Sequence, residues 1–349
     1  MPVFKHPEFD NHELVAHHAD PRTGLRAIIA VHNTALGKGL GGCRMWPYGS
    51  EDEALTDVLR LSRGMTYKAA LADLPQGGGK SVILGDPRRD KTPEMMRAMG
   101  RFVDSLGGKY VVAEDSGTSV ADIHVMAEET KHVGGLADEK SAAAGRTGDP
   151  SPATAYGTYV GILAAVRAQL GRADVKGLRV AIQGVGNVGY RLAKHLHEGG
   201  AQLWVTDIHP PAVERCVKEF GATAVPMEAI FTVAADVFAP CALGAVINDR
   251  TLPLLRAGIV AGAANNQLAE PRHGRMLMEK GVLYAPDYVI NAGGIIDIHY
   301  EGPGYDPARV KAHLDLIGTT LATVFERSRM EQRPTGEIAD RMAEERFRK

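Results

Sequence analysis

The stretch LRVAIQGVGNVGYRLAKHLHEGGAQLWVTD, residues 178–207, decides the fold of this chain. Residues 178–183 are apolar and β-branched, as is typical of a buried strand, and residues 201–206 repeat that character. The segment between them, residues 187–198, has the composition of a helix. Two strands joined through a helix form a parallel sheet with a right-handed crossover. The stretch therefore predicts a doubly wound α/β domain.

The turn in this stretch, GVGNVG (184–189), has the G-x-G-x-x-G spacing of a dinucleotide-binding loop. Gly184 permits a tight turn, Gly186 lets the backbone approach a pyrophosphate, and Gly189 lets helix and strand pack closely. The pyrophosphate would lie at the helix start, where Asn187 and Val188 follow. The spacing alone is weak, since glycine turns also serve structure. A strand before it and a helix after it favour a Rossmann-type site.

An acidic residue, Asp207, ends the strand that follows the turn. In this position a carboxylate accepts hydrogen bonds from the adenosine ribose hydroxyls and repels a 2′-phosphate. The alternative is an ordinary solvated residue at a strand end. The first interpretation predicts NAD as the cofactor in preference to NADP.

The composition is that of an ordinary globular protein, with 44% apolar and 23% charged residues. Its 40 Lys+Arg against 42 Asp+Glu argue against a general nucleic-acid binder, which needs a basic surface. No apolar run reaches the roughly 20 residues that span a bilayer. The three cysteines, Cys43, Cys216 and Cys241, have neither disulfide nor metal-ligand spacing, so no metal is expected and a reducing cytoplasm is favoured.

The position of the glycine turn, after about half of the chain, predicts two domains. We expect a mixed α/β substrate-binding and oligomerisation domain over residues 1–147 and the NAD-binding domain over 148–324. The boundary falls in the Gly-, Thr-, Asp- and Pro-containing segment 145–149. A C-terminal helix at about 325–349, continuing one that starts at Pro307, is expected to return to the first domain, and a cleft between the domains would hold the substrate.

Strand or helix patterns also occur elsewhere in the sequence. Strands are expected at 25–33 and 109–113 in the first half, and short ones at 235–239 and 258–263 in the second. Apolar residues at helical spacing predict a helix at 51–73. Thr92 followed by Pro93 indicates the start of another helix, with threonine as its cap.

Two lysines and an acid in the first half are candidates for chemistry. Residues 39–44 (GLGGCR) are interpreted as a glycine-rich turn, Lys68 lies near the end of an apolar helix, and Lys80 follows three glycines just before a strand. Glycines beside Lys80 would let a substrate approach backbone and amine together. The alternatives are a helix lysine extending to solvent for Lys68 and a surface turn for Lys80. Pattern alone leaves both open.

The acid is Asp115, which follows the strand at 109–113 in the segment AEDSGTS. Strand ends are where α/β folds place their functional groups. The alternative is a helix cap for the segment from Ser119, a role that Asp115 or, more naturally, Thr118 could fill. The residues alone do not distinguish a functional Asp115 from a helix cap.

At these residues the chain resembles the Glu/Leu/Phe/Val dehydrogenase family, over nearly its whole length. Ten collinear motifs carry the resemblance: GLGGCRMW (39–46), MTYKAAL (65–71), GGGK (77–80), AEDSGTS (113–119), GDPSPATAYG (148–157), GVGNVG (184–189), APCALGAVIND (239–249), GAANNQL (262–268), YVINAGG (288–294) and ADRMAEER (339–346). The resemblance implies an enzyme that deaminates an amino acid oxidatively, to a 2-oxo acid and ammonium.

The family's roles map onto the matching residues. The resemblance implies that Lys68 binds the substrate carboxylate, that Lys80 is the general base and acid, and that Asp115 holds Lys80 and the attacking water. It assigns further substrate contacts to Gly41, Gly42 and Asn266. It assigns the cofactor to Thr154, to Asn265 and to the segment Ala239, Pro240 and Cys241. The choice between Asn265 and Asn266 is open by one residue, and Cys241 is interpreted as a small packing residue without thiol chemistry.

The resemblance also bears on the substrate. Leu40 stands where glutamate-specific members carry a lysine, so an acidic side chain would lose its ionic partner and be penalised by burial. Ala113, Ile295 and Ile298 match pocket positions, and Ala113 is similar to the leucine-type members, whereas phenylalanine-type members tend to have glycine there. Ile295 and Ile298 depart from the usual valines. Leucine or another branched-chain amino acid is favoured over phenylalanine or another aromatic one.

Two other classes of function compete with this interpretation. A shikimate- or folate-type dehydrogenase would also join a catalytic domain to a nucleotide domain, but it needs no ammonium. A regulator that senses NAD without catalysis would have no use for Lys68, Lys80 and Asp115 together. Because relatives form closed symmetric assemblies, a homo-oligomer is expected.

Overall fold

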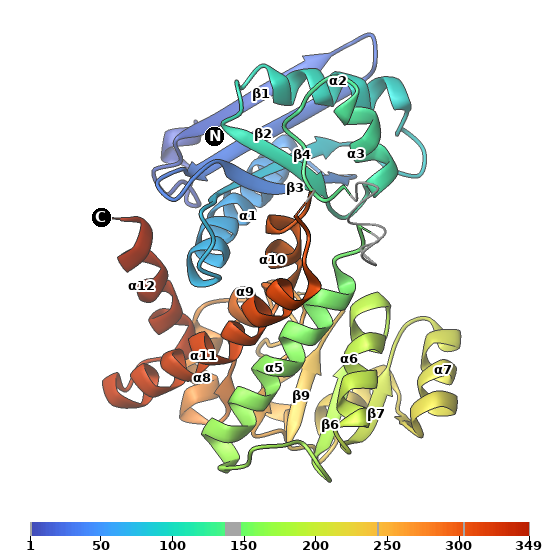
Figure 1. The fold of residues 1–349 in the computed structure, drawn as a ribbon, viewed down its shortest axis with the longest axis vertical. Helices are drawn as coiled ribbons and strands as arrows, with labels where there is room; N and C mark the ends of the chain where they lie inside the picture. The colour runs from blue at the N-terminus through green and yellow to red at the C-terminus, as the bar shows by residue number, and fades with distance from the viewer. Residues whose placement is uncertain (1, 137–147, 243, 303, 349) are drawn as a thin grey trace. The chain divides into compact units, whose positions relative to one another are not determined.

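The computed structural model describes residues 2–136, 148–242, 244–302 and 304–348 (Figure 1). The chain divides into two units. Unit 1 comprises Met1–Asp149, Ile298–Tyr305 and Ala343–Lys349, and unit 2 comprises Pro150–Asp297 and Asp306–Met342. Residues 145–147 of the expected linker lie outside the described residues. The predicted α/β class is confirmed, and each unit has a sheet of its own.

The sheet of unit 1 has five strands in the order β1-β2-β4-β3-β5. β1 and β2 pair antiparallel, as do β2 and β4, whereas β3 runs parallel to both β4 and β5. The strands are β1 (Leu14–Asp20), β2 (Leu25–Asn33), β3 (Gly39–Trp46), β4 (Gly77–Leu84) and β5 (Tyr110–Glu114).

Helices cover both faces of this sheet, as Figure 1 shows. Ile28 and Ala30 of β2 face α1 (Glu51–Leu71), and Ile29 and Val31 face α2 (Pro93–Asp104) and α3 (Val120–Ala127). Successive residues of a strand point to opposite faces, so β2 is apolar throughout because both faces are covered. Thr92 caps α2 by accepting from the Met95 amide at 3.2 Å, as the sequence predicts.

The glycine-rich segment 39–44 is not a turn, and its interpretation as one was wrong. It forms the first residues of β3, between β4 and β5, and Lys80 likewise lies within β4 rather than before it. Glycine is required at positions 41 and 42 because any side chain there would clash with neighbouring atoms. A Cβ on Gly41 would lie 1.7 Å from the Gly79 carbonyl oxygen, and one on Gly42 would lie 2.6 Å from the Asp115 Cβ.

Unit 2 contains a six-stranded parallel sheet in the order β11-β10-β9-β6-β7-β8. The order reverses at β6, as in a doubly wound sheet, where ligands bind at the carboxyl ends of the strands. The strands are β6 (Arg179–Gln183), β7 (Gln202–Thr206), β8 (Thr223–Ala224), β9 (Val237–Pro240), β10 (Ile259–Val260) and β11 (Leu283–Tyr284).

Helices alternate with these strands and then continue alone towards the C-terminus. No helix of the described ranges has the length and apolar character to span a membrane. The helices are α5 (Ser151–Leu170), α6 (Asn187–Glu198), α7 (Pro210–Phe220), α8 (Arg272–Glu279), α9 (Asp287–Ile290), α10 (Gly293–His299), α11 (Pro307–Glu331) and α12 (Thr335–Phe347), with short 3₁₀ turns at Val3–Lys5, Met227–Thr232 and Leu252–Leu254.

Candidate active site

A buried ion pair joins Lys80 to Asp115 in unit 1. The Lys80 ammonium contacts the Asp115 Oδ2 directly, and Lys80 is only 7% exposed. β3 lies between the two strands that supply them, and its glycines leave space for the pair. Lysine is seldom buried without a partner, and Asp115 is the partner here. Because Lys80 is buried within β4, the surface-turn alternative is excluded.

Arg44 of β3 supplies a second cation to Asp115. Its Nε lies 3.6 Å from Asp115 Oδ2, and its Nη1 lies 2.9 Å from a carboxylate oxygen of Asp57, which also accepts from the Tyr48 hydroxyl at 2.7 Å. Burial raises the pKa of Asp115, but Lys80 and then Arg44 overcome this and hold it at about 2. Asp115 is therefore a carboxylate at any physiological pH. Sequence reasoning missed Arg44, whose only signal was its place beside Gly41 and Gly42.

Helix capping does not explain Asp115. The N-cap of α3 is Ser119, whose hydroxyl accepts from the Asp122 amide at 3.3 Å, while the Asp122 carboxylate accepts from the Ser119 amide at 2.8 Å. This capping box satisfies the start of the helix by itself. Thr118 is not the cap either, since its hydroxyl donates to the Cys43 carbonyl at 2.8 Å. The Asp115 carboxylate instead contacts Lys80 and Arg44 and accepts from the Ser116 amide at 2.7 Å.

Lys68 lies in the last turn of α1 and is partly buried. Its helix packs directly on β4, because a Cβ on Gly78 would lie 2.2 Å from the Thr66 amide nitrogen. The same turn of α1 thus carries Lys68 and touches the strand of Lys80. Its role towards a substrate carboxylate stays a prediction.

Three predicted pocket residues come together around one backbone segment of unit 1. A Cβ on Gly134 would lie 3.5 Å from a Leu40 methyl and 3.6 Å from an Ile298 methyl, and one on Gly135 would lie 3.8 Å from the Ala113 Cβ. Leu40, Ala113 and Ile298 thus lie around residues 134–135, and we call these three side chains the apolar wall; the Glu301 carboxylate lies there too, accepting from the Gly135 amide at 2.7 Å. Ile295, predicted beside Ile298, belongs to unit 2, and its place in the pocket stays a prediction.

The glycine turn of unit 2 has the geometry that its sequence predicts. Gly184 has φ +91°, a conformation that disfavours other residues, and a Cβ on Gly189 would lie 2.0 Å from the Gly184 carbonyl oxygen. A Cβ on Gly186 would meet nothing within 4 Å. The open space lies at the start of α6, where Asn187 and Val188 begin the helix, so an anionic group fits there.

Asp207 lies against this turn, because its carboxylate accepts from the Val185 amide at 2.7 Å and from the His209 amide at 2.9 Å. Ala239 and Pro240 end β9 beside Ile182 and Gln183 of β6. The Cys241 amide donates to the Gln183 carbonyl at 2.7 Å. Burial raises the pKa of the Cys241 thiol to about 12, which suits the packing role expected for it.

Asn265 and Asn266 differ in their partners. The Asn265 side-chain oxygen accepts from the Asn291 amide at 2.7 Å, and the Asn266 backbone N–H donates to Asp287, with Asn266 at φ 50°. Thr154, in the first turn of α5, donates to the Pro150 carbonyl at 2.9 Å. Sequence reasoning missed Asn291, which is 5% exposed and orients Asn265. The contacts of these residues with cofactor or substrate stay predictions.

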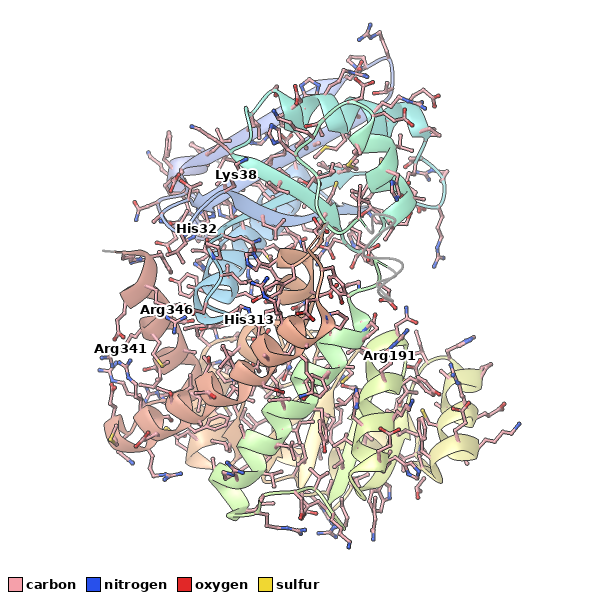
Figure 2. All side chains as sticks on the ribbon, viewed as in Figure 1. His32, Lys38, Arg191, His313, Arg341 and Arg346 are labelled. Atoms are coloured by element: carbon pink, nitrogen blue, oxygen red, sulfur yellow. The ribbon has the colours of Figure 1, made fainter. Side chains whose placement is uncertain are left out.

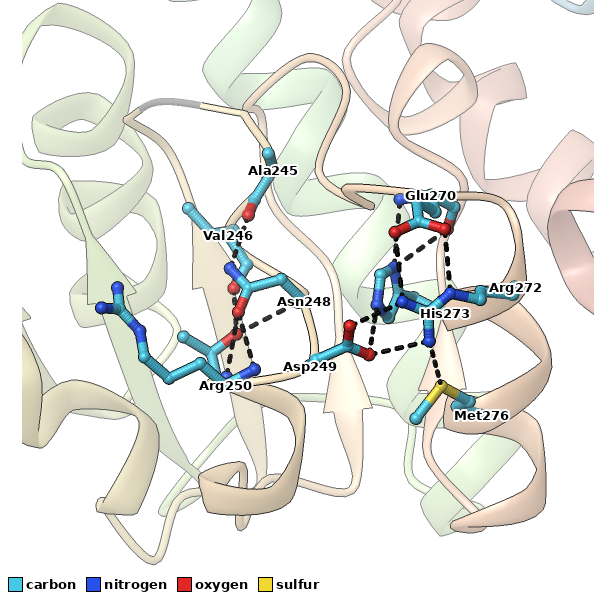
Figure 3. A network of polar contacts seen from close by, with 10 residues as sticks. Ala245, Val246, Asn248, Asp249, Arg250, Glu270, Arg272, His273 and Met276 are labelled. Carbon is cyan, nitrogen blue, oxygen red and sulfur yellow. Dashed lines mark hydrogen bonds and ion pairs between the residues drawn. The ribbon is translucent and has the colours of Figure 1, made fainter.

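A charged cluster holds the segment after β9 against α8, as Figure 3 shows. The Arg272 guanidinium contacts Asp249 at 2.6 Å and Glu270 at 2.9 Å, and His273 Nε2 lies 3.2 Å from Asp249. Although two carboxylates and a histidine could suit a cation, Arg272 already neutralises both acids. The cluster is therefore an ion-pair network that ties residues 245–251 to α8.

Comparison with known proteins agrees with this arrangement. The protein-family model described as "Glu/Leu/Phe/Val dehydrogenase, dimerisation domain" matches residues 12–132. A second family model, "Glutamate/Leucine/Phenylalanine/Valine dehydrogenase", matches residues 145–210 and 205–302. The leucine dehydrogenase of Geobacillus stearothermophilus is 52% identical over 99% of this chain and 94% of that protein. The chain belongs to the Glu/Leu/Phe/Val dehydrogenase family.

Other members of the family differ in the amino acid in their names. The phenylalanine dehydrogenase of Bacillus thermotolerans is 47% identical over 98% of this chain and 90% of that protein. The crystal structure of L-tryptophan dehydrogenase from Nostoc punctiforme matches with a TM-score of 0.83 and 43% identity, over 97% of this chain and 96% of that one. The chain is thus an amino acid dehydrogenase, and the predicted enzyme class is confirmed.

Proposed function

We propose that this enzyme catalyses the reversible, NAD-dependent oxidative deamination of an apolar L-amino acid, with leucine and other branched-chain substrates favoured. The observation that carries the proposal is the buried Lys80–Asp115 pair in the sheet of unit 1, whose strands β3 and β5 also supply Leu40 and Ala113 to the apolar wall that Ile298 of α10 completes. The wall offers no cation to a side-chain carboxylate, which disfavours glutamate. The similarity to leucine dehydrogenase supports the same substrate class.

The reaction begins with the substrate carboxylate on Lys68 and its neutral amino group towards Lys80. The glycine turn and Asp207 of unit 2 would hold NAD, which would supply the acceptor for the hydride of the α-carbon. The substrate is then an iminium, and water adds to its carbon while Lys80 takes a proton from that water. Lys80 returns the proton to the nitrogen, and the C–N bond then breaks as Lys80 takes the hydroxyl proton, which leaves a 2-oxo acid. The released ammonia accepts that proton and leaves as ammonium. Asp115, ionised throughout, orients Lys80 and stabilises its positive charge.

The residues of unit 2 fit NAD. Gly186 leaves open space at the start of α6 for the pyrophosphate, and the Asp207 carboxylate lies beside the Val185 amide, where the adenosine ribose would bind. We assign the pyrophosphate to Gly184, Gly186, Asn187, Val188 and Gly189, and the nicotinamide half to Thr154, Ala239, Pro240, Cys241 and Asn265. Asp207 would repel a 2′-phosphate, so NADP should bind more weakly than NAD.

A spectrophotometric assay tests the function. NADH oxidation with 4-methyl-2-oxopentanoate should require ammonium, and in the reverse direction leucine should give a higher kcat/KM than glutamate. Oxidation of NADH without ammonium would indicate a hydroxy-acid or shikimate-type reaction instead. A panel of leucine, valine, phenylalanine, tryptophan and glutamate also tests the second candidate, an aromatic amino acid dehydrogenase, which the similarity to phenylalanine and tryptophan dehydrogenases favours.

A Lys80→Ala variant tests the catalytic assignment. General acid–base groups contribute about 10²–10⁴-fold, so kcat should fall by that factor while the Kd for NAD stays nearly unchanged. An equal loss of turnover and NAD binding would contradict the role given to Lys80. Lys80→Arg is the matched variant, since it keeps the charge beside Asp115 but cannot give up its proton.

We also propose that the chain works as a homo-oligomer in the cytoplasm on small molecules only. The match of residues 12–132 to a dimerisation domain supports the assembly, and the three cysteines, all free thiols, suit a reducing compartment. Light scattering of the purified protein at micromolar concentration should give a mass at least twice the 37.3 kDa of one chain.

A further inference from the structure

The end of α12 contacts the last turns of α1 within unit 1. The Tyr67 hydroxyl donates to a Glu344 carboxylate oxygen at 2.8 Å. The Arg346 guanidinium donates to the Ala70 carbonyl and lies 3.6 Å from the Asp73 carboxylate. Residues almost 280 positions apart in the sequence are thus joined. Arg346 thus adds a side-chain donor to a carbonyl in the last turn of α1, which also accepts from the Asp73 amide at 3.2 Å.

Phe347 and Arg348 extend this contact to β2. Phe347 is 4% exposed, and its ring packs edge-on against Tyr67 at 5.3 Å and against His32 at 6.1 Å. Arg348 pairs with Asp10 at 3.0 Å, and Asp10 lies 3.4 Å from His32 Nε2. His32 and Arg346 are both labelled in Figure 2. Four residues, Glu344, Arg346, Phe347 and Arg348, form what we call the C-terminal clasp.

The contacts of the clasp converge on the two residues before Lys68. His32 Nδ1 lies 2.8 Å from the Thr66 hydroxyl, and Thr66 in turn packs on Gly78 of β4. Tyr67 is held on its other side by Glu344 and Phe347. One turn of α1 is therefore held by β4 and by the C-terminal clasp. These contacts fix the direction in which the Lys68 side chain leaves the helix.

We propose that the C-terminal clasp is a positioning element for Lys68 and so sets the affinity for the amino acid; the inference rests on the function proposed above. The Lys80–Asp115 pair is held separately, by β3, β4, β5 and Arg44. Weakening the clasp should therefore raise the KM for the amino acid and leave kcat nearly unchanged, since substrate binding depends on Lys68 and proton transfer depends on Lys80.

Two variants with different risks test this. Tyr67→Phe removes one hydroxyl with little change in volume and should raise the KM for leucine about two- to tenfold, with kcat and the Kd for NAD nearly unchanged. Phe347→Ala removes the buried ring and should raise that KM about tenfold or more, whereas Phe347→Leu, which refills most of the space, should restore most of the affinity. Arg341→Gln is the control, because Arg341 of the same helix pairs with Glu331 in unit 2.

Hydrogen exchange gives a readout that needs no activity. Amides of the peptide 62–72 should exchange faster in Tyr67→Phe and Phe347→Ala than in the parent protein or in Arg341→Gln. A lower melting temperature with unchanged KM and unchanged exchange at 62–72 would overturn the inference. If the two variants exchange faster at 62–72 than the parent protein, but the parent shows no ammonium-dependent activity, the clasp stands and the proposed function is refuted. If Phe347→Ala does not fold, Tyr67→Phe decides alone.

Discussion

The two functional regions of this enzyme use glycine for opposite purposes. In unit 1, Gly41 and Gly42 lie in the middle of a sheet with ordinary strand conformations, and neighbouring backbone occupies the place of their missing side chains. In unit 2, Gly184 turns the chain at φ +91° and Gly186 faces open space. The first pair allows protein to pack on protein, whereas Gly186 leaves open space, where the pyrophosphate is proposed to bind.

The two regions also differ in their charged and polar groups. In unit 1 the Lys80 and Arg44 side chains both lie against the Asp115 carboxylate, and Lys80 is buried between close-packed strands. The glycine turn of unit 2 offers backbone N–H groups at a helix start, with Asp207 accepting from one of them. We therefore expect the stability of unit 1 to depend on pH and on packing. Ligand binding at the glycine turn of unit 2 should instead depend on the size of the residue placed there.

Gly41→Ala should have the largest effect and tests the packing half of the comparison. The new Cβ would lie 1.7 Å from the Gly79 carbonyl oxygen, so β3 and β4 would have to separate. We expect a loss of more than about 3 kcal/mol in the free energy of unfolding, measured by urea titration. Gly258→Ala is the control, because its Cβ would meet nothing within 4 Å. Similar stability of the two variants would remove the distinction between the regions.

The pH response of unit 1 comes second, and His32 contributes to it together with His12, whose pKa is also lowered by burial. Burial lowers the pKa of His32 from 6.5 to about 4, with a smaller contribution from His12. The unfolded chain therefore binds a proton between pH 6.5 and 4 that the folded chain does not, so stability present above pH 6.5 is lost as the pH falls towards 4. The loss due to this residue should be on the order of 3 kcal/mol.

The measurement is urea unfolding at pH 7 and pH 4. His32→Asn, which keeps a hydrogen-bonding group near Thr66, should be less stable at pH 7 but should lose less between the two pH values. His124→Asn, at an exposed position of α3, should keep the parent's difference. If both variants lose as much as the parent, His32 is not the titrating group.

Gly186→Ala should have a smaller effect, confined to cofactor binding. A methyl group at this position meets no protein atom within 4 Å, so the melting temperature should hardly change. It would occupy the space through which the pyrophosphate approaches the backbone, and the Kd for NAD should rise about tenfold, or about 1.4 kcal/mol. Calorimetric titration with NAD measures this. A fall in stability with unchanged affinity would mean that Gly186 serves packing, as Gly41 does.

Much of the fold could be predicted from local pattern. The strands β6 and β7 and the helix α6 of unit 2 follow from residues 178–207 alone, and Gly184 and Gly189 have the turn and packing roles that the spacing predicts. The helix at 51–73 and the strands at 25–33 and 109–113 appear within two residues of their observed ends. Such elements are set by period and by caps, which lie within the same few residues.

What could not be predicted depends on neighbours that are distant in sequence. Gly39 to Gly42 suggest a turn because glycine is rare inside strands, and only the closeness of β4 and β5 shows why it is needed there. Arg44 reaches Asp115 because β3 pairs with β5. Ser119, rather than Thr118, caps α3, a difference of one residue that local preference does not resolve.

Ala113→Gly should have the smallest effect and applies the comparison to the substrate pocket. Ala113 is 4% exposed and packs in the apolar wall with Leu40 and Ile298, where the side chain of the amino acid is proposed to bind. Removing its methyl enlarges the wall without touching a charge, so the ratio of kcat/KM for phenylalanine over leucine should rise about fivefold, or about 1 kcal/mol. Because the residue is small, the ammonium requirement and the Kd for NAD should not change. An unchanged ratio would mean that this wall does not meet the substrate, and the choice between branched-chain and aromatic substrates would then have to come from residues of unit 2, such as Ile295.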